Sequence, residues 1–208
     1  MRESDREILT RRRVLEEALA FIDQKGVDLL SMRKLGNRLS VEAMSLYNYV
    51  ASKDELLDAV ASLLLELVDL SGPSPPDWQS RARRVAGRVR EVALAHPRAF
   101  PLLTTRSISS FHAWEPLLEA FQVAQDAGYT PADAGHVVSA VSGYVVGTML
   151  LEIAQIKRGH ILLPEDIPAE HTKLRAYVAS RAGVERSEEF WRGFDLLIAG
   201  MERQLGLP

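Results

Sequence analysis

The stretch LSMRKLGNRLSVEAMSLYNYVASKDELLDAV, residues 30–60, decides how this chain folds. Its apolar residues recur with helical spacing, which predicts a short helix from Ser31 to Leu39 and a second from Glu42 to Val50. On the second helix, Leu46 and Val50 lie four residues apart and are expected to face inward. Two short helices joined by a tight turn are typical of a helix-turn-helix unit.

The remaining surface of the second helix carries side chains suited to contacting DNA in the major groove. Asn48 can donate to and accept from an adenine edge, and Ser45 and Tyr47 can bond to phosphates. Arg33 and Lys53 add positive charge at the flanks, and Ala43 or Met44 can contact a thymine methyl group. The predicted DNA-binding residues are Arg33, Ala43, Met44, Ser45, Tyr47, Asn48, Tyr49 and Lys53. The spacing equally fits a small helical bundle in which Tyr47 and Tyr49 are ordinary core or rim aromatics.

Helical periodicity continues outside this stretch, and no run of alternating β-branched residues interrupts it, so the expected fold is all-α. Ser4 with Glu7 and Ser52 with Glu55 have the spacing of capping boxes, which begin helices. The segment 71–76 contains three prolines and cannot continue a helix. We therefore predict a helix-turn-helix domain in residues 1–70, including a connecting fourth helix. Residues 71–208 are predicted to form a second helical domain, with helices near 78–95, 110–127, 131–157, 170–181 and 187–205.

The composition narrows the class of protein. Of the 208 residues, 47% are hydrophobic and 25% charged, as in a globular chain, and the absence of Cys excludes disulfides and thiolate metal sites. The first ten residues lack the apolar core of a secretory signal, and the longest uncharged apolar stretch, 137–151, is shorter than a bilayer crossing requires. The expected location is the cytoplasm, without a membrane segment.

Two further observations bear on function. The net charge is −3, yet residues 1–53 carry ten Lys and Arg against eight Asp and Glu, so this part is the one suited to a polyanion. The five histidines form no metal-binding spacing on a helix, and no G-x-S-x-G, Walker or G-x-G-x-x-G motif occurs. We therefore expect neither an enzyme nor a cofactor, although a helical enzyme with an unrecognised His and acid cluster remains an alternative.

The helix predicted near 131–157 has small residues every fourth position, which lets another helix approach closely. The last helix offers an apolar partner surface, and together the two helices predict a four-helix subunit interface around a two-fold axis. The predicted interface residues are Gly135, Ser139, Gly143, Gly147, Phe190, Phe194, Leu197 and Met201. The alternative is that the two helices pack against each other within one chain.

Residues 30–60 resemble the DNA-binding domain of the TetR family of bacterial transcription regulators. The motif is carried by Leu46-Tyr47, Tyr49-Val50, Ser52-Lys53 and Glu55-Leu56-Leu57. Residues 78–98, 113–134 and 190–205 are similar to the ligand-binding and dimerisation domain of the tetracycline repressors. The resemblance implies a homodimeric, ligand-responsive repressor of a palindromic operator, with Tyr47 and Lys53 on phosphates. The alternative is an all-α small-molecule-binding or scaffold protein that does not read DNA.

The chain departs from this family at several positions. Ser40 stands where the turn between the two short helices usually has Gly, and Ala43 replaces a long polar side chain, which predicts a different operator. Positions that hold polar drug and magnesium contacts in the tetracycline repressors are Val68, Val85, Val89, Leu103 and Ala120. These apolar residues predict a small, largely apolar effector, with Phe100, Leu117, Phe121 and Tyr144 completing the pocket wall, unless the same residues simply fill a core.

Overall fold

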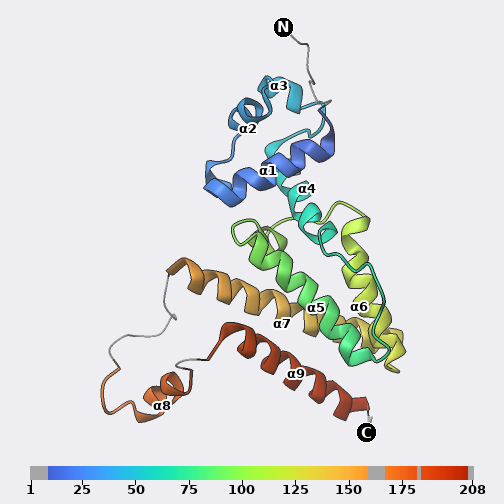
Figure 1. The fold of residues 1–208 in the computed structure, drawn as a ribbon, viewed down its shortest axis with the longest axis vertical. Coiled ribbons are helices and arrows are strands. Elements are labelled where there is room, and N and C mark those ends of the chain that lie inside the picture. The colour runs from blue at the N-terminus through green and yellow to red at the C-terminus, as the bar shows by residue number, and fades with distance from the viewer. Residues whose placement is uncertain (1–8, 159–166, 182–183, 206–208) are drawn as a thin grey trace. The chain divides into compact units, whose positions relative to one another are not determined.

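The computed structural model describes residues 9–158, 167–181 and 184–205, and these contain helices, turns and loops but no strand (Figure 1). The predicted all-α fold is confirmed. The chain divides into two compact units, of which the first comprises residues to Pro73 with Gly87–Glu119 and the second comprises Ser74–Ala86 with residues from Ala120 onward. This division differs from the predicted single boundary at residue 71, because the segment after Gly87 packs against helix α4 of the first unit.

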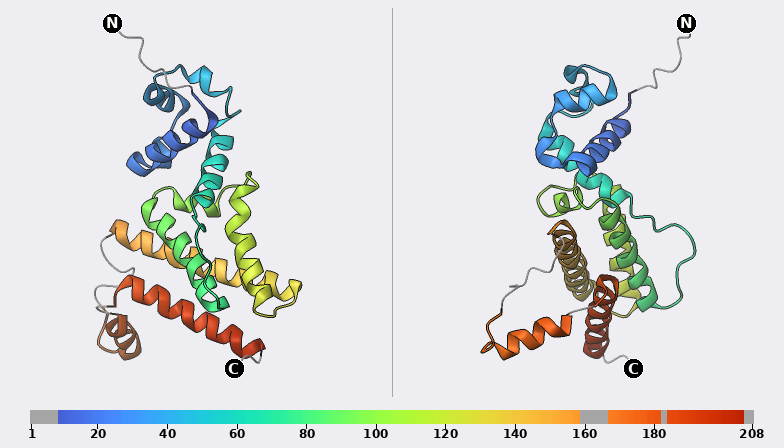
Figure 2. Two further views of the ribbon diagram at one scale, coloured as in Figure 1. Left: turned by 45° about the vertical axis from the view of Figure 1, so that its right-hand side comes forward. Right: turned by 60° about the vertical axis from the view of Figure 1, so that its left-hand side comes forward.

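The first unit contains helices α1 (Arg11–Lys25), α2 (Met32–Leu39), α3 (Ala43–Leu46) and α4 (Lys53–Glu66). It also contains the short 3₁₀ helices η1 (Val27–Leu29), η2 (Phe100–Thr104) and η3 (His112–Trp114). Helix α4 packs against α1, η2 and η3 (Figure 2). Its apolar residues belong to the hydrophobic core of the unit. Eight of its fourteen residues are buried, so α4 is the element around which the unit is built.

Side-chain caps explain where three of these helices begin. The hydroxyls of Thr10, Ser31 and Ser52 accept hydrogen bonds from backbone N–H groups three residues on, as N-cap residues do. The predicted start of the first helix at Ser4 lies outside the described residues. Within them, α1 begins after Thr10.

Helix α3 is shorter than the predicted segment Glu42–Val50, since it ends at Leu46. The backbone tightens there: the N–H groups of Tyr47, Asn48 and Tyr49 bond to carbonyls three residues earlier, as in a 3₁₀ turn. Regular α-helical spacing therefore covers one turn only. The position of α3 depends on its contacts with neighbouring elements, because one turn of helix is not stable alone.

The turn between α2 and α3 depends on two residues. Ser40 has φ 56° and ψ 39°, a left-handed conformation that favours glycine, and the N–H of Val41 bonds to the Gly36 carbonyl at 2.9 Å. A Cβ at Gly36 would lie 2.8 Å from the Val41 oxygen, so only glycine permits α3 to approach α2 this closely. Ser40 thus keeps the left-handed turn even though the family pattern has Gly at this position.

Replacing Ser40 with Gly is expected to raise the free energy of unfolding of the first unit by about 1 kcal/mol, because an L-residue in this conformation carries a strain of roughly that size. Urea titration of the two proteins measures the difference. Ser40→Ala is the control and is expected to give no gain, since alanine meets the same strain. Equal midpoints for the unaltered protein and the Ser40→Gly variant would show that the turn carries no such cost.

The remaining helices are α5 (Trp78–Ala95), α6 (Glu115–Asp126), α7 (Pro131–Arg158), α8 (Thr172–Arg181) and α9 (Arg186–Leu205). In the second unit α7 packs against α9, and two tyrosines fix this packing. Tyr144 donates to the Phe190 carbonyl at 2.7 Å, and Tyr129 donates to the Met201 carbonyl at 2.9 Å. Gly193 faces Tyr144 so closely that any side chain there would collide with its hydroxyl.

Helix α7 is also long and apolar enough between Pro131 and Ile156, by length and composition alone, to cross a membrane. The sequence analysis considered only the uncharged residues 137–151, which are too few to cross a bilayer. The wider window Pro131–Ile156 is long enough because it includes Glu152. Glu152 is 9% exposed and α7 contacts α9 within the same unit. Of the window, 22% is buried, and a single helix of this length and composition is weak evidence for a membrane span.

Candidate nucleic-acid interface and dimerisation surface

The surface formed by α3 and the turn after it presents several of the predicted DNA-binding side chains. Met44 is 72% exposed and Tyr47 is 43% exposed, and Asn48 is exposed beside them. Leu46 and Val50 are 0% and 2% exposed, so their predicted inward direction is confirmed. The arrangement leaves both polar and apolar side chains available to base edges, as direct readout requires.

The other predicted contacts differ in how available they are. Arg33 on α2 is exposed, whereas Ala43, Ser45 and Lys53 are half-buried. Tyr49 is half-buried, and its hydroxyl donates to the Leu9 carbonyl at 2.8 Å. Tyr49 therefore holds the turn after α3 against the segment before α1 through its hydroxyl, and its assignment as a DNA contact stays a prediction.

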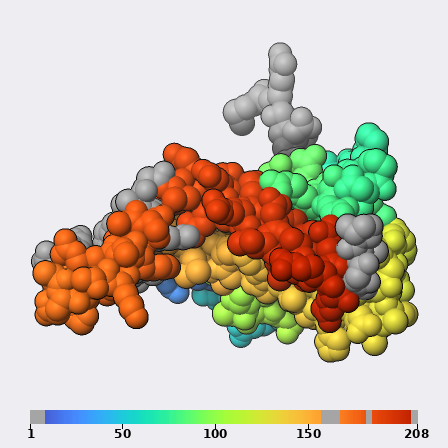
Figure 3. Space-filling model, turned by 90° about the horizontal axis from the view of Figure 1, so that it is seen from below, coloured from blue at the N-terminus to red at the C-terminus, as the bar shows by residue number. Residues whose placement is uncertain are grey.

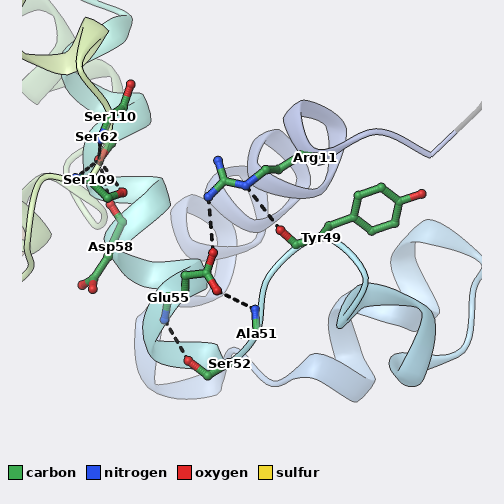
Figure 4. Close-up of polar contacts among 9 residues, drawn as sticks. All are labelled: Arg11, Tyr49, Ala51, Ser52, Glu55, Asp58, Ser62, Ser109 and Ser110. Carbon is green, nitrogen blue, oxygen red and sulfur yellow. Dashed lines mark hydrogen bonds and ion pairs between the residues drawn. The ribbon is translucent and has the colours of Figure 1, made fainter.

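Two polar networks along α4 connect it to the rest of the first unit (Figure 4). At its N-terminus, the Ser52 hydroxyl accepts from the Glu55 N–H, which is one half of the predicted capping box. The Glu55 carboxylate accepts from the N–H of Ala51 at 2.6 Å, one residue before the N-cap that a capping box requires. Two turns on, the Ser62 hydroxyl donates to the Asp58 carbonyl and accepts from the N–H groups of Ser109 and Ser110 at 2.9 and 3.3 Å. The sequence predicted the Ser52 cap of the first network, but it carries no signal for the Ala51 bond or for the second network.

The predicted effector residues fall in both units, and each is placed within its own. In the first unit Val68 belongs to the hydrophobic core, and Val89 and Leu103 pack against it. Phe100 is fully buried and Leu117 is half-buried. The core alternative is thereby supported for Val68, Val89 and Leu103.

In the second unit Val85 is buried, and Ala120, Phe121 and Tyr144 are half-buried. The Tyr144 ring contacts the Phe190 ring, with a centroid separation of 5.9 Å, in addition to its hydrogen bond, and burial raises the pKa of its phenol. Its hydroxyl is therefore engaged in joining α7 to α9. Only the aromatic ring of Tyr144 is therefore left to contact an effector.

An open groove of about 820 Å³ lies in the first unit between the end of α4 and the start of α6. Of the predicted effector residues only Val68 lines it, and four carboxylates, Glu66, Asp69, Glu115 and Glu119, surround it. Beside it, hydrogen bonding to Glu115 raises the pKa of His112. Within the described ranges no group of three His, Cys, Asp or Glu side chains could hold a metal ion.

The small residues of α7 occupy a side of the helix that its own chain leaves open. Ser139 and Gly143 are exposed and Gly135 and Gly147 are half-exposed, and a Cβ added at any of these three glycines would meet no atom within 4 Å. Val138, Val145 and Met149 are buried elsewhere on the helix. The face predicted for a second subunit is therefore open in the single chain.

On α9 the predicted interface residues are of two kinds, three that are buried and one that is half-exposed. Phe190, Phe194 and Met201 are 2%, 1% and 7% exposed, because they pack within their own unit, and this removes them from the surface that a second subunit could contact. Leu197 is half-exposed. The alternative of packing within one chain is correct for these three side chains.

The apolar residue that α9 does expose was not among those predicted. Leu196 is 67% exposed, and Gly200, four residues on, is exposed as well. Leu151 on α7 is 57% exposed, and Ala140 on the same helix is exposed too. The four-residue spacing of Leu196 and Gly200 on α9 could have indicated an exposed face for helix packing. The prediction instead followed the more apolar aromatic residues of the same helix. Figure 3 shows α9 lying against α7 in the second unit.

Known families match nearly the whole chain. Residues 14–60 match the family described as "Bacterial regulatory proteins, tetR family", and residues 72–205 match "Tetracyclin repressor-like, C-terminal domain". An HTH-type transcriptional regulator of Saccharopolyspora erythraea is 32% identical over 206 residues, which cover 96% of this chain and 87% of the relative.

Two other relatives agree. Tetracycline repressor protein class D of Escherichia coli is 28% identical over 205 residues, 95% of this chain and 91% of that protein. The crystal structure of a possible TetR family transcriptional regulator from Streptomyces coelicolor superimposes with a TM-score of 0.82 at 26% identity, covering 93% of this chain and 99% of that one.

Proposed function

Because this chain belongs to the TetR family of bacterial transcription regulators, we propose that it is a homodimeric repressor, released from a palindromic operator by a small, largely apolar effector. The observation that carries the proposal is the exposed group of Met44, Tyr47 and Asn48 on α3 and the turn after it, a surface anchored by the buried Leu46. The family match and this surface favour a non-enzymatic DNA-binding protein, and its DNA target is consistent with a cytoplasmic location.

Dimerisation supplies the spacing on which operator recognition depends. Two helix-turn-helix surfaces related by a two-fold axis read half-sites about 34 to 36 Å apart, one helical turn of DNA. We propose that the open faces of α7 and α9, with Ser139, Gly143, Leu196 and Gly200, meet their copies to form a four-helix interface. Membership of the family supports a dimer. The exposure of these residues in the single chain supports the choice of this surface.

The effector would act by preferring a separation of the two DNA-reading surfaces that no longer matches two major grooves. A preference of about 100-fold, roughly 2.7 kcal/mol, gives a large change in operator occupancy. Val85, Ala120 and Phe121 of the second unit have apolar side chains, so they offer a ligand no polar anchor. An apolar effector fits these residues better than a metal-chelated one does.

Selection of bound fragments from a random duplex pool tests the proposal. We expect a palindromic consensus whose half-site centres lie about ten base pairs apart, since the dimer reads each half-site once. Competition with bulk DNA across a salt series then gives the specificity ratio. Recovery of unrelated sequences, with no advantage over bulk DNA, would favour the alternative of an all-α small-molecule-binding or scaffold protein.

A further inference from the structure

The link between α3 and α4 is held at three points by side-chain hydrogen bonds. The Tyr49 hydroxyl donates to Leu9, the Tyr49 carbonyl accepts from Arg11 Nε at 3.3 Å, and the Ala51 N–H donates to Glu55 at 2.6 Å. Arg11 Nη2 lies 3.6 Å from Glu55 Oε1, which joins two of these points. Figure 4 shows the Arg11 guanidinium between the Glu55 carboxylate and the Tyr49 carbonyl, with the Tyr49 ring pointing away from it.

This arrangement has little reason to exist for stability alone. The side chains of Arg11 and Glu55 are 50% and 43% exposed, and exposed ion pairs contribute about 0 to 1 kcal/mol. Helix α3 has a single turn, so its own hydrogen bonds do not determine its direction. Atoms that fix residues 49–51 therefore fix where Tyr47 and Asn48 point.

We propose that Arg11 and Glu55 are positioning residues for DNA recognition, and that Arg11 acts on Tyr49 and Glu55 rather than on a DNA phosphate. The inference rests on the proposed function, since it assigns a role within DNA reading. An exposed arginine in a DNA-binding unit is ordinarily read as a phosphate ligand. Here its Nε–H and one Nη are directed at a carbonyl and a carboxylate of its own chain.

Two variants test this inference: one removes the hydrogen bond from Arg11 to the Tyr49 carbonyl, and the other removes the charge of Glu55. Arg11→Met removes the guanidinium and keeps the apolar stem, and Glu55→Gln keeps an acceptor for the Ala51 N–H but removes the charge that faces Arg11. The matched control is Arg12→Met, because the Arg12 guanidinium bonds to Glu16 and Glu66 on α1 and α4, away from residues 49–51. Arg11→Lys serves as a second variant if Arg11→Met folds poorly.

The first measurement uses free protein, and follows hydrogen exchange of the backbone amides of residues 47–51. Exchange at Ala51 is expected to accelerate at least fivefold in Arg11→Met, which releases the Tyr49 carbonyl, and in Glu55→Gln, whose neutral amide oxygen is a weaker acceptor than the carboxylate. Exchange is expected to stay unchanged in Arg12→Met. Unchanged exchange in both test variants would overturn the inference, whatever the protein does with DNA.

The second measurement is the dissociation constant for the selected duplex and for bulk DNA across a salt series. We expect Arg11→Met and Glu55→Gln each to weaken specific binding at least tenfold, and the double variant to weaken it no further. Binding to bulk DNA and the salt slope are expected to match those of the unaltered protein. A slope smaller by about 0.9 in Arg11→Met, with bulk binding reduced by the same factor as specific binding, would identify a phosphate contact and overturn the inference. An unaltered protein that binds all duplexes equally would overturn the proposed function and this inference with it.

Discussion

Replacing Tyr47 and Asn48 together with alanine is expected to weaken operator binding at least 100-fold while leaving the fold and the dimer intact. Both side chains are exposed, so their removal leaves no cavity and no buried polar group without a partner. A good base contact, as expected of Asn48, contributes about 1 to 3 kcal/mol to discrimination, and a hydrogen bond from Tyr47 to a charged phosphate contributes about 1.5 to 3 kcal/mol. Gel-shift titration against the selected duplex, with analytical ultracentrifugation for the dimer, measures both effects.

The salt dependence distinguishes loss of recognition from loss of general attraction. Tyr47 and Asn48 are uncharged, so the slope of log K against log salt is expected to stay the same while the ratio of specific to bulk binding falls. Tyr177→Ala is the matched control, because Tyr177 is 54% exposed on α8 and lies outside the first unit. Operator affinity within twofold of the unaltered protein in the double variant would reject α3 as the recognition helix.

Local chemistry made the helix-turn-helix region predictable from the sequence. Hydroxyl caps such as Ser31 and Ser52, and apolar residues at helical spacing, act over a few residues and can be read from the sequence directly. The end of α3 was placed four residues too late, because the spacing of Leu46 and Val50 does not distinguish an α-helix from the 3₁₀-type turn found at Tyr47–Tyr49. Tyr49 illustrates the same point, since its partner Leu9 is forty residues away.

Longer-range relations were predicted less well. The apolar character of Phe190 and Phe194 was correctly read as contact with another helix, but composition does not say whether that helix belongs to the same chain. Leu196, which α9 exposes, was overlooked because the neighbouring aromatic residues carried the stronger apolar signal. Ser62 gave no signal, because a serine inside an apolar helix acquires its role only through backbone groups of residues 109–110.

Replacing Gly143 with leucine is expected to convert the dimer into a monomer and to weaken operator binding at least 100-fold. A Cβ added at this exposed position meets no atom of a neighbouring element within 4 Å, so we expect the monomer to accommodate the larger side chain. Leucine is also a better helix former than glycine by about 0.8 kcal/mol, so the isolated chain should be no less stable. A second helix packed on the small-residue face would instead be displaced, and each DNA-reading surface would then bind its half-site without the advantage of linkage. Sedimentation and operator titration on the same sample measure the two losses.

Two control variants separate a subunit interface from packing within one chain. Ala179→Leu adds the same kind of bulk at an exposed position of α8 and is expected to leave the dimer unchanged. Gly193→Ala is expected to lower the stability of the single chain, because its methyl group collides with the Tyr144 hydroxyl and breaks the bond to Phe190. If Gly143→Leu still sediments as a dimer with full operator affinity, the small-residue face of α7 is not where two copies meet. The two glycine variants therefore test different contacts of the second unit. Gly193→Ala tests the packing of α7 against α9 within one chain, and Gly143→Leu tests the face that this helix pair presents to a second copy.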